Sequence, residues 1–411
     1  MLVRRISFFI MVFAVSVTAS AQKDVLEFSH LTTADGLTHS NVTCVFQDSH
    51  GFMWFGTEDG LNRYDGYHLI SYKRETNNKF SLSNNFIKDI VEDANGDLWI
   101  GTMGGGLNRY DRNTNRFTQF RNKLGDSTTL SNDFIADLMM DNKGRIWIST
   151  SKGLNVFDLK TYKFQTYYHR KNEPGSLNED QSTFTFQDSR NRVWIASGAN
   201  GLDRFDEPSN GFVHFTHNPA IKNSLSGNKI TTLFEDSKHN FWVGTAGNGL
   251  NLMDPITGRC QVFLREKNNP NSLCDNVVFS ITEDDENNLW IGSENGGISI
   301  YNPSEKTFHS YVSNELDNTT LSSSAVNSIY KDHQGNMWIA TYNAGVNYIT
   351  KKMRTFIHYR YTTEKASLSS SKVLSIMEDS RQNLWVGTDG GGLNRLDRKT
   401  NSFIHYRHRE G

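Results

Sequence analysis

Carboxylates recur in this sequence at a fixed distance from tryptophan. Each of the eight tryptophans follows an aspartate by six residues, and a leucine stands seventeen residues before it. The tryptophans are Trp54, Trp99, Trp147, Trp194, Trp242, Trp290, Trp338 and Trp385. The aspartates are Asp48, Asp93, Asp141, Asp188, Asp236, Asp284, Asp332 and Asp379. Because clustered carboxylates bind metal ions or act as general acids and bases, these aspartates are the first candidates for chemistry.

The spacing of these aspartates argues against a shared catalytic or metal site. Consecutive tryptophans are 45 to 48 residues apart, so each aspartate belongs to its own structural unit and the eight do not converge. In the pattern Asp-x-x-Gly/Asn the carboxylate can accept backbone N–H groups across a turn, and Gly or Asn tolerates positive φ. We therefore assign the aspartates and the tryptophans a structural role in repeated hairpins.

The cysteines and histidines add no reactive motif. Cys44, Cys260 and Cys274 are irregularly spaced and form no C-x-x-C pair, so the sequence predicts neither a zinc site nor a disulfide framework. The thirteen histidines fit no H-E-x-x-H pattern, and no G-x-S-x-G or Walker pattern is present. We predict no catalytic residue, no metal and no cofactor.

Two classes of enzyme with similar repeats are the alternative to a chain without catalytic activity. Sialidases contain a hairpin similar to D-x-x-G-x-x-W, but they need clustered arginines and a tyrosine nucleophile. Here Arg63, Arg109 and Arg204 occupy equivalent positions in three different units. Quinoprotein dehydrogenases repeat tryptophan over eight blades, but they carry vicinal cysteines that this sequence lacks. A secreted propeller enzyme acting on glycans stays open as the second hypothesis.

The elements that carry these residues are short strands. The unit from Ser81 to Phe120 contains four apolar segments of about five residues, separated by turns rich in Asn, Gly and Asp. No segment has a sustained 3.6-residue period, so we expect no helix after the N-terminal segment. Four-stranded sheets that repeat every 40–50 residues are typical of a β-propeller. The predicted fold is all-β, with blades of four antiparallel strands.

The ends of the repeat array predict how the ring closes. Segment Phe28–Leu31 resembles the fourth strand of a unit whose first three strands are missing. The seventh unit carries Thr350 where most others have Asp or Asn, and the basic run Lys351-Lys352-Met353-Arg354 follows it. We expect Val25–Leu31 to complete blade seven, with Phe356–Tyr359 as the sealing strand of a second propeller. The predicted domains are 22–352, a seven-bladed propeller, and 353–411, the first blade of an incomplete second one. A single eight-bladed ring is the alternative.

The N-terminus has the features of an export signal. Arg4 and Arg5 precede the apolar run Ile6–Val17, and Ala19-Ser20-Ala21 fits a cleavage site before Gln22. We expect residues 1–21 to be a signal peptide and the mature chain to lie in the periplasm; a short membrane anchor is the alternative. With 43 basic and 45 acidic residues, the net charge of −2 favours no nucleic-acid partner.

The repeats resemble a known family. Segments such as SLSNNFIKDIVEDANGDLWIGTMGGGLNRYD are similar to two-component regulator propeller repeats, and the similarity extends over about residues 25–411. The resemblance implies the periplasmic sensor region of hybrid two-component systems of Bacteroidetes. Such receptors recognise oligosaccharides and pass the signal to a histidine kinase that regulates polysaccharide-utilisation genes. The resemblance also implies a second propeller, a β-sandwich and a kinase, none of which is complete here. We therefore expect recognition without enzymatic activity.

Candidate binding residues are expected on one face of the ring. In a propeller, the loops between strands two and three and the loops that join successive blades share a face. Their residues differ from blade to blade, and their amides and carboxylates suit sugar hydroxyls. The predicted ligand-binding residues are Glu58, Asp59, Asn200, Asn248, Glu294, Asn295, Tyr342, Asn343, Asp133, Asp180 and Asp275.

Overall fold

The structure is a computed structural model that describes residues 26–351, 359–362, 366–398, 400 and 402–408. The predicted signal peptide and most of the predicted sealing strand Phe356–Tyr359 lie outside the described residues. The chain divides into two compact units, Met1–Thr350 and Lys351–Gly411. Among the described residues no helix is long and apolar enough to cross a membrane.

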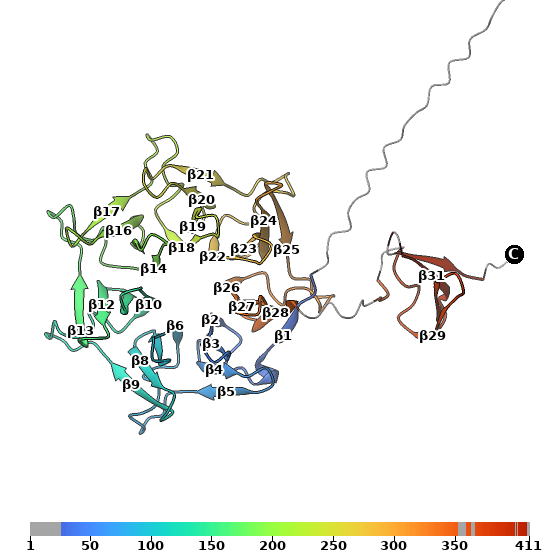
Figure 1. Ribbon diagram of the computed structural model, residues 1–411, viewed down its shortest axis with the longest axis horizontal. Helices are drawn as coiled ribbons and strands as arrows, with labels where there is room; N and C mark the ends of the chain where they lie inside the picture. The colour runs from blue at the N-terminus through green and yellow to red at the C-terminus, as the bar shows by residue number, and fades with distance from the viewer. Residues whose placement is uncertain (1–25, 352–358, 363–365, 399, 401, 409–411) are drawn as a thin grey trace, which may run out of the picture. The chain divides into compact units, whose positions relative to one another are not determined.

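The first unit is a ring of seven four-stranded antiparallel sheets (Figure 1). Blade one contains β2 (Val42–Gln47), β3 (Met53–Thr57), β4 (Gly60–Tyr64) and β5 (Leu69–Tyr72). Blade two contains β6 (Ile87–Glu92), β7 (Leu98–Thr102), β8 (Gly106–Asp111) and β9 (Arg116–Phe120). Blade three contains β10 (Ile135–Met140), β11 (Arg145–Thr150), β12 (Leu154–Asp158) and β13 (Lys163–Tyr167). Blade four contains β14 (Phe184–Gln187), β15 (Val193–Ala196), β16 (Leu202–Asp206) and β17 (Gly211–Phe215). Blade five contains β18 (Ile230–Glu235), β19 (Phe241–Thr245), β20 (Leu250–Met253) and β21 (Cys260–Phe263). Blade six contains β22 (Val278–Glu283), β23 (Leu289–Ser293), β24 (Ile298–Asn302) and β25 (Thr307–Tyr311). The predicted all-β propeller fold is confirmed.

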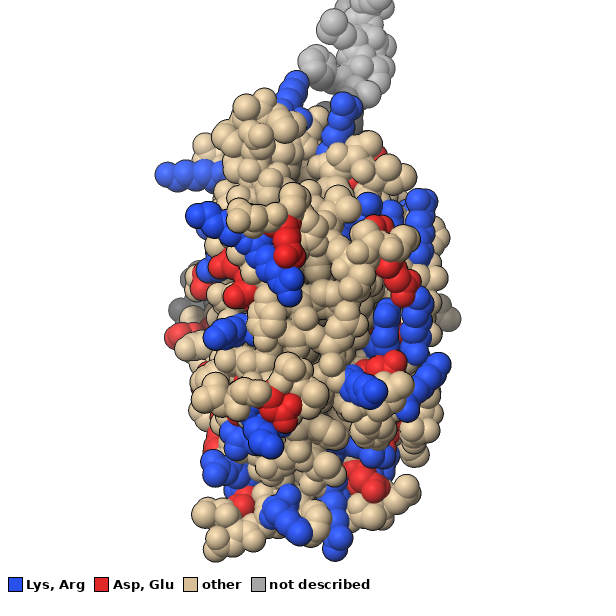
Figure 2. All heavy atoms as spheres, turned by 90° about the vertical axis from the view of Figure 1, so that its left-hand side faces the viewer, with Lys and Arg blue, Asp and Glu red and all other residues tan. Residues whose placement is uncertain are grey.

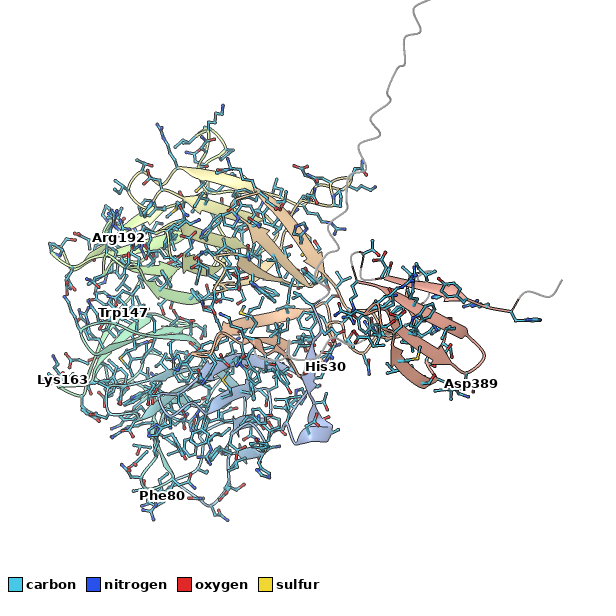
Figure 3. The ribbon with its side chains drawn as sticks, turned by 45° about the vertical axis from the view of Figure 1, so that its right-hand side comes forward. His30, Phe80, Trp147, Lys163, Arg192 and Asp389 are labelled. Atoms are coloured by element: carbon cyan, nitrogen blue, oxygen red, sulfur yellow. The ribbon has the colours of Figure 1, made fainter. Side chains whose placement is uncertain are left out.

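The seventh blade combines strands from the two ends of the unit. It consists of β26 (Val326–Lys331), β27 (Met337–Thr341), β28 (Val346–Ile349) and β1 (Ser29–Leu31). Strand β1 pairs antiparallel with β28, with Ser29 opposite Tyr348 and Leu31 opposite Val346. Figure 3 places His30 on this strand, where its Nε2 lies 2.9 Å from the carbonyl oxygen of Asn318. The predicted closure by the N-terminal segment is therefore confirmed.

A short 3₁₀ turn follows β1 and departs from the expectation of no helix. It covers Thr33–Asp35, and a capping box stabilises it: the Thr32 hydroxyl accepts the N–H of Ala34, and the Asp35 carboxylate accepts the N–H of Thr32. Three residues are too few to show a helical period, which explains why the sequence pattern did not reveal it.

Neighbouring blades pack through tryptophan and small residues. Trp54 is fully buried between blades one and two, with its ring 5.7 Å from that of Tyr72 and 5.6 Å from that of Tyr110. Two residues after the next tryptophan, a Cβ at Gly101 would lie 2.7 Å from Cγ2 of Ile135 in blade three. Because a side chain at Gly101 would clash there, the small residue allows the next blade to approach.

The repeated aspartates hold the hairpin turns. In each of the eight units the Trp Nε1 donates to the Asp Oδ2, at 2.6 to 2.9 Å. In blade two the other oxygen, Oδ1 of Asp93, accepts the N–H groups of Asn95 and Asp97. One carboxylate thus stabilises the turn and satisfies the buried indole N–H, which would otherwise cost free energy.

The second unit is a single four-stranded sheet. Its strands are β29 (Val373–Glu378), β30 (Leu384–Thr388), β31 (Gly392–Asp397) and β32 (Ser402–Tyr406). A small buried cluster contains Leu368, Val386, Leu396 and Phe403. Every residue of β29 is exposed, whereas the innermost strands of the seven-bladed ring are largely buried or half-buried. The sheet has the hydrogen bonding of a blade without the burial that neighbouring blades provide.

Candidate functional site

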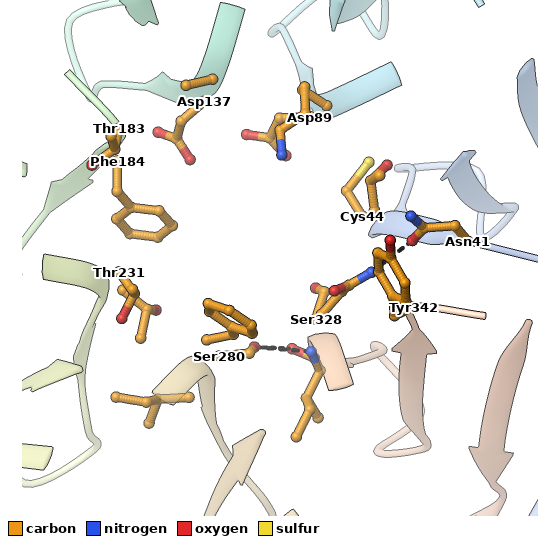
Figure 4. A pocket seen from close by; sticks show the side chains of 18 of the residues that line it. Asn41, Cys44, Asp89, Asp137, Thr183, Phe184, Thr231, Ser280, Ser328 and Tyr342 are labelled. Atoms are coloured by element: carbon orange, nitrogen blue, oxygen red, sulfur yellow. Dashed lines mark hydrogen bonds between the residues drawn. The ribbon is translucent and has the colours of Figure 1, made fainter. Parts of the chain in front are cut away.

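The innermost strands of the ring enclose a cavity of about 560 Å³ on the propeller axis. Its wall comes from all seven blades, so residues far apart in sequence face one another across it (Figure 4). The lining residues are Asn41, Thr43, Cys44, Glu58, Phe86, Lys88, Asp89, Ala136, Asp137, Thr183, Phe184, Thr231, Thr232, Leu233, Phe279, Ser280, Ile281, Asn327, Ser328, Ile329 and Tyr342. The cavity is within the usual size range of small-molecule sites, about 300–1,000 Å³.

The cavity reaches the face on which ligand binding was predicted. Glu58 and Tyr342 lie in turns between the second and third strands, and Asn41 and Phe86 precede first strands. Asn41 connects this rim: its Nδ2 donates to Oε1 of Glu58 at 2.7 Å, and its Oδ1 accepts from Nδ2 of Asn327 at 2.9 Å. The rim is thus a polar network that spans the junction between blades seven and one.

Side chains facing the axis connect neighbouring blades. Thr43 Oγ1 donates to the carbonyl oxygen of Ile87, and Asn327 Nδ2 donates to that of Val42, each across a blade boundary. The carboxylates of Asp89 and Asp137 instead accept hydrogen bonds from backbone N–H groups. Oδ2 of Asp89 accepts the N–H of residue 138 at 2.9 Å, and Oδ2 of Asp137 accepts the N–H of residue 185 at 2.8 Å. These bonds satisfy backbone groups that no ladder between innermost strands can pair.

The two axial aspartates are electrostatically unusual. Burial raises the pKa of Asp89 to about 6. Burial, together with the nearby charge of Asp89, raises the pKa of Asp137 well above its usual range. Burial also raises the pKa of the Cys44 thiol, so this cysteine is neutral and unsuited to act as a nucleophile or metal ligand. The described residues contain no group of three or more His, Cys, Asp or Glu side chains placed to hold a metal.

The predicted binding residues differ in their surroundings. Glu58 and Tyr342 line the axial cavity. Asp59 accepts from Lys73 Nζ at 2.6 Å, and this bond lowers its pKa. Asp133 and Asp180 each accept a backbone N–H from the segment that leads into their own blade, at 2.6 and 2.7 Å. These three carboxylates therefore have structural partners.

The remaining predicted residues lie on separate loops. The carboxylate of Asp275 accepts the N–H of Asn295, and Asn295 lines a second cavity of about 520 Å³ in blade six. Asn248 donates its N–H to Thr245 Oγ1, and the carbonyl oxygen of Asn200 accepts from Asn178. The Glu294 and Asn343 side chains form no hydrogen bond with a described residue. Of the eleven predicted residues, the axial cavity brings together only Glu58 and Tyr342.

Sequence reasoning missed the cavity residues between these turns. Lys88, Asp89 and Asp137 lie ten or eleven residues before a tryptophan, at positions where other blades carry Thr, Ser, Cys, Asn, Ala or Phe. The positions on either side, nine and twelve residues before tryptophan, are nearly always apolar. Variation inside an otherwise constant strand was the signal that these side chains face the axis.

Comparison with known proteins identifies the repeats. The family described as two component regulator propeller matches residues 36–59, 81–104, 129–152, 224–247, 272–295, 320–343 and 367–390. Seven of the eight repeated units of the chain thus match two component regulator propeller repeats. The matched segments include Glu58 and Tyr342 of the cavity rim, as well as the aspartate–tryptophan hairpins of six blades and of the second unit.

Proteins similar to this chain include signalling proteins. The chain is 35% identical to histidine kinase P4 of Formosa agariphila over 68 residues, which make up 16% of this chain and 5% of that protein. The extracellular domain of a hybrid two component system from B. thetaiotaomicron has a similar fold, with TM-score 0.69 and 23% identity over 94% of this chain and 55% of that one. A second such domain gives TM-score 0.64 at 24% identity, over 93% and 53%. The chain thus spans about half the length of these solved relatives.

A more distant similarity is to a lyase of known structure. Virginiamycin B lyase from Staphylococcus aureus has TM-score 0.59 and 15% identity to this chain, over 79% of this chain and 99% of the lyase. Identity at this level shows a shared propeller fold and nothing about the reaction.

Proposed function

We propose that this chain is the periplasmic ligand-sensing part of a two-component signalling receptor and that it recognises an oligosaccharide. In a full-length receptor, the signal would pass to a histidine kinase that regulates polysaccharide-utilisation genes. The observation that carries the proposal is the match of regulator propeller repeats in seven segments between residues 36 and 390. The histidine kinase of F. agariphila and the extracellular domains of B. thetaiotaomicron support it.

The proposed ligand site is the loop face around the axial cavity. Tyr342 is 57% exposed there, and an aromatic ring of this kind can pack against the apolar face of a sugar. Glu58, Asn41 and Asn327 offer acceptors and donors next to it. Glu294 and Asn343 add polar groups on neighbouring loops, with no hydrogen bond to a described side chain.

The proposed organisation follows the repeats. Residues 22–352 would form the sensing propeller, and residues 353–411 would form the first blade of a second one. Residues 1–21 would direct export. The exposed strand β29 supports the second assignment, because a blade buries both of its faces only between neighbours.

Titration calorimetry with a panel of oligosaccharides tests the proposal. Tyr342→Ala and Glu294→Gln should each weaken binding of the ligand that is found. Matched controls are Tyr67→Ala and Glu286→Gln, which change exposed residues of the same types in turns on the opposite face. We expect these controls to bind as the unchanged protein does.

Two results would contradict the proposal. Binding lost in Tyr67→Ala or Glu286→Gln, but kept in the loop-face variants, would place the site on the opposite face. Turnover of any glycan in the panel would instead favour a propeller enzyme, the second hypothesis from the sequence.

A further inference from the structure

The axial cavity is acidic beneath its polar rim. Its wall contains three carboxyl groups, those of Glu58, Asp89 and Asp137, and one amine, that of Lys88. Burial raises the pKa of the Cys44 thiol, so this group adds no negative charge near pH 7. A ligand entering the cavity therefore meets an excess of negative charge, which disfavours acidic sugars and other anions.

One of these carboxylates is buried and only partly engaged. Asp137 is 7% exposed. Its Oδ2 accepts both the N–H and the hydroxyl of Thr185, at 2.8 and 2.6 Å. Its Oδ1 accepts no hydrogen bond from a described residue. Figure 4 shows the carboxylates of Asp137 and Asp89 pointing into the space that the seven blades surround. A donor on a ligand in the cavity would complete the hydrogen bonding of Asp137.

Aromatic rings line the same cavity as the two carboxylates. Phe184 and Phe279, from the innermost strands of blades four and six, line the same cavity, and Phe86 and Tyr342 line its rim. Aromatic faces attract organic cations because the face of the ring carries partial negative charge. A metal ion would gain little from such rings, and no metal-holding cluster is present among the described residues. Carboxylates combined with aromatic rings and hydroxyls are chemically suited to a protonated amine.

We propose that the axial cavity binds a hydroxylated organic cation, such as an amine-bearing sugar, with its ammonium group at Asp89 and Asp137 and its hydroxyls toward the Asn41–Glu58 rim. This inference deepens the proposed function and rests on it for the loop face as the ligand entrance. It adds the charge of the ligand and the residues that select for it.

Proton release should accompany binding. The raised pKa values of the two aspartates mean that the empty pair holds a proton near neutral pH, and coupled carboxylates titrate as a pair. A bound ammonium favours the doubly ionised pair, so binding expels this proton. Lys88, on the same strand as Asp89, favours ionisation in the free protein and limits the effect. Affinity should therefore rise with pH from about 6 to 8, by at most about tenfold per unit.

Calorimetry with two matched polyols tests the inference. N-methyl-D-glucamine carries an amine that stays protonated through this pH range, whereas D-glucitol has a similar polyol chain without the amine. We expect the amine to bind at least about tenfold more tightly than D-glucitol, with heats that depend on the ionisation enthalpy of the buffer because a proton is released.

Asn substitutions identify the site. Asp137→Asn keeps an oxygen that can accept the bonds from Thr185 while removing the charge, and Asp89→Asn does the same for its own partner. Each should abolish the preference for the amine and its pH dependence. Asp254→Asn is the control, because Asp254 lies in an exposed turn away from the cavity. The pH dependence of the unchanged protein provides a readout even if one variant does not fold.

The possible outcomes separate this inference from the proposed function. Equal binding of the two polyols, no binding of either, or an amine preference that survives both Asn substitutions would overturn the cation site. Neutral oligosaccharides that bind through Tyr342 in the same protein would leave the proposed function standing. A preference for the amine that is lost in either Asn variant and kept in Asp254→Asn would support both the cation site and the proposed function.

Discussion

Deleting strand β1 should open the ring and lower its stability markedly. The deletion of residues 26–32 removes Phe28 and Leu31, which are 6% and 7% exposed, together with the pairing to β28. It also removes the bond from the N–H of Phe28 to the carbonyl oxygen of Thr319, 2.8 Å long. Replacing a buried Phe by Ala alone costs about 3–5 kcal/mol. Because the deletion removes this side chain and the strand pairing as well, 3–5 kcal/mol is a lower estimate.

Calorimetric unfolding measures this effect. A loss of about 3–5 kcal/mol corresponds to a fall in Tm of roughly 6–20 °C, from the usual 2–4 °C per kcal/mol for larger domains. Phe308→Ala is the matched control, because Phe308 has the equivalent place on β25 and is 4% exposed, yet its blade is continuous in the chain. Phe308→Ala should lower Tm by the amount that the loss of one buried phenylalanine costs, without opening the ring.

Hydrogen exchange distinguishes an open ring from a merely weakened one. After the β1 deletion, amides of β28 that face the missing strand should lose protection, whereas Phe308→Ala should leave β28 protected. An unchanged Tm together with unchanged protection of β28 would refute the closure mechanism. Ending the chain near Lys352 should cost the ring little, since the two units are separately compact.

Three further predictions concern packing and charge. Trp194→Ala should destabilise the ring by about 3–5 kcal/mol in denaturant unfolding, because the indole is fully buried, whereas Trp385→Ala in the second unit should leave the main transition unchanged. Gly101→Val should cost about 1–3 kcal/mol in the same assay, because its Cβ would lie 2.7 Å from a side chain of the next blade. The hydrogen bond from His214 to Asp203 raises the pKa of this histidine, so its contribution to stability should be complete below the unfolded pKa, near 6.5, and disappear as pH rises through the higher folded value. NMR titration of His214, and unfolding of His214→Gln across pH 5.5–8.5, would measure this; a stability difference between the two proteins that does not change with pH would contradict it.

Much of the fold was predictable because each repeat is stabilised by contacts between residues that are close in sequence. The aspartate–tryptophan hairpin is stabilised by contacts within six residues, as in Trp99 Nε1 to Asp93 Oδ2 at 2.9 Å, so the sequence spacing reveals it directly. Closure was predictable because a lone fourth strand at one end complements a blade that lacks one. Asn108 shows a repeated contact that the sequence also contained but that was overlooked: its Oδ1 accepts the N–H of Ser83, and most blades repeat this bond.

The cavity was harder to predict because it belongs to no single repeat. Asp89 and Asp137 become neighbours only when the blades are arranged around an axis, and a register shift in β6 and in β10, next to these residues, alters how the strand runs there. Their raised pKa values arise from burial by side chains of other blades, which local patterns do not reveal. Conversely, Asp133 and Asp180 looked available on a polar loop, yet each accepts a backbone N–H.

Closure by β1 also sets the timing of assembly. Ser29 is synthesised early, but its partner Tyr348 lies 319 residues later in the chain. At typical synthesis rates of about 5–20 residues per second, the two are separated by roughly 15–65 s. During this interval β1 has no partner strand, because β28 has not been made. The growing array ends in an unpaired strand edge of the kind that promotes aggregation. The last step of folding therefore joins the oldest part of the ring to the youngest, and any delay in finishing blade seven lengthens the time in which strands of different chains can exchange partners.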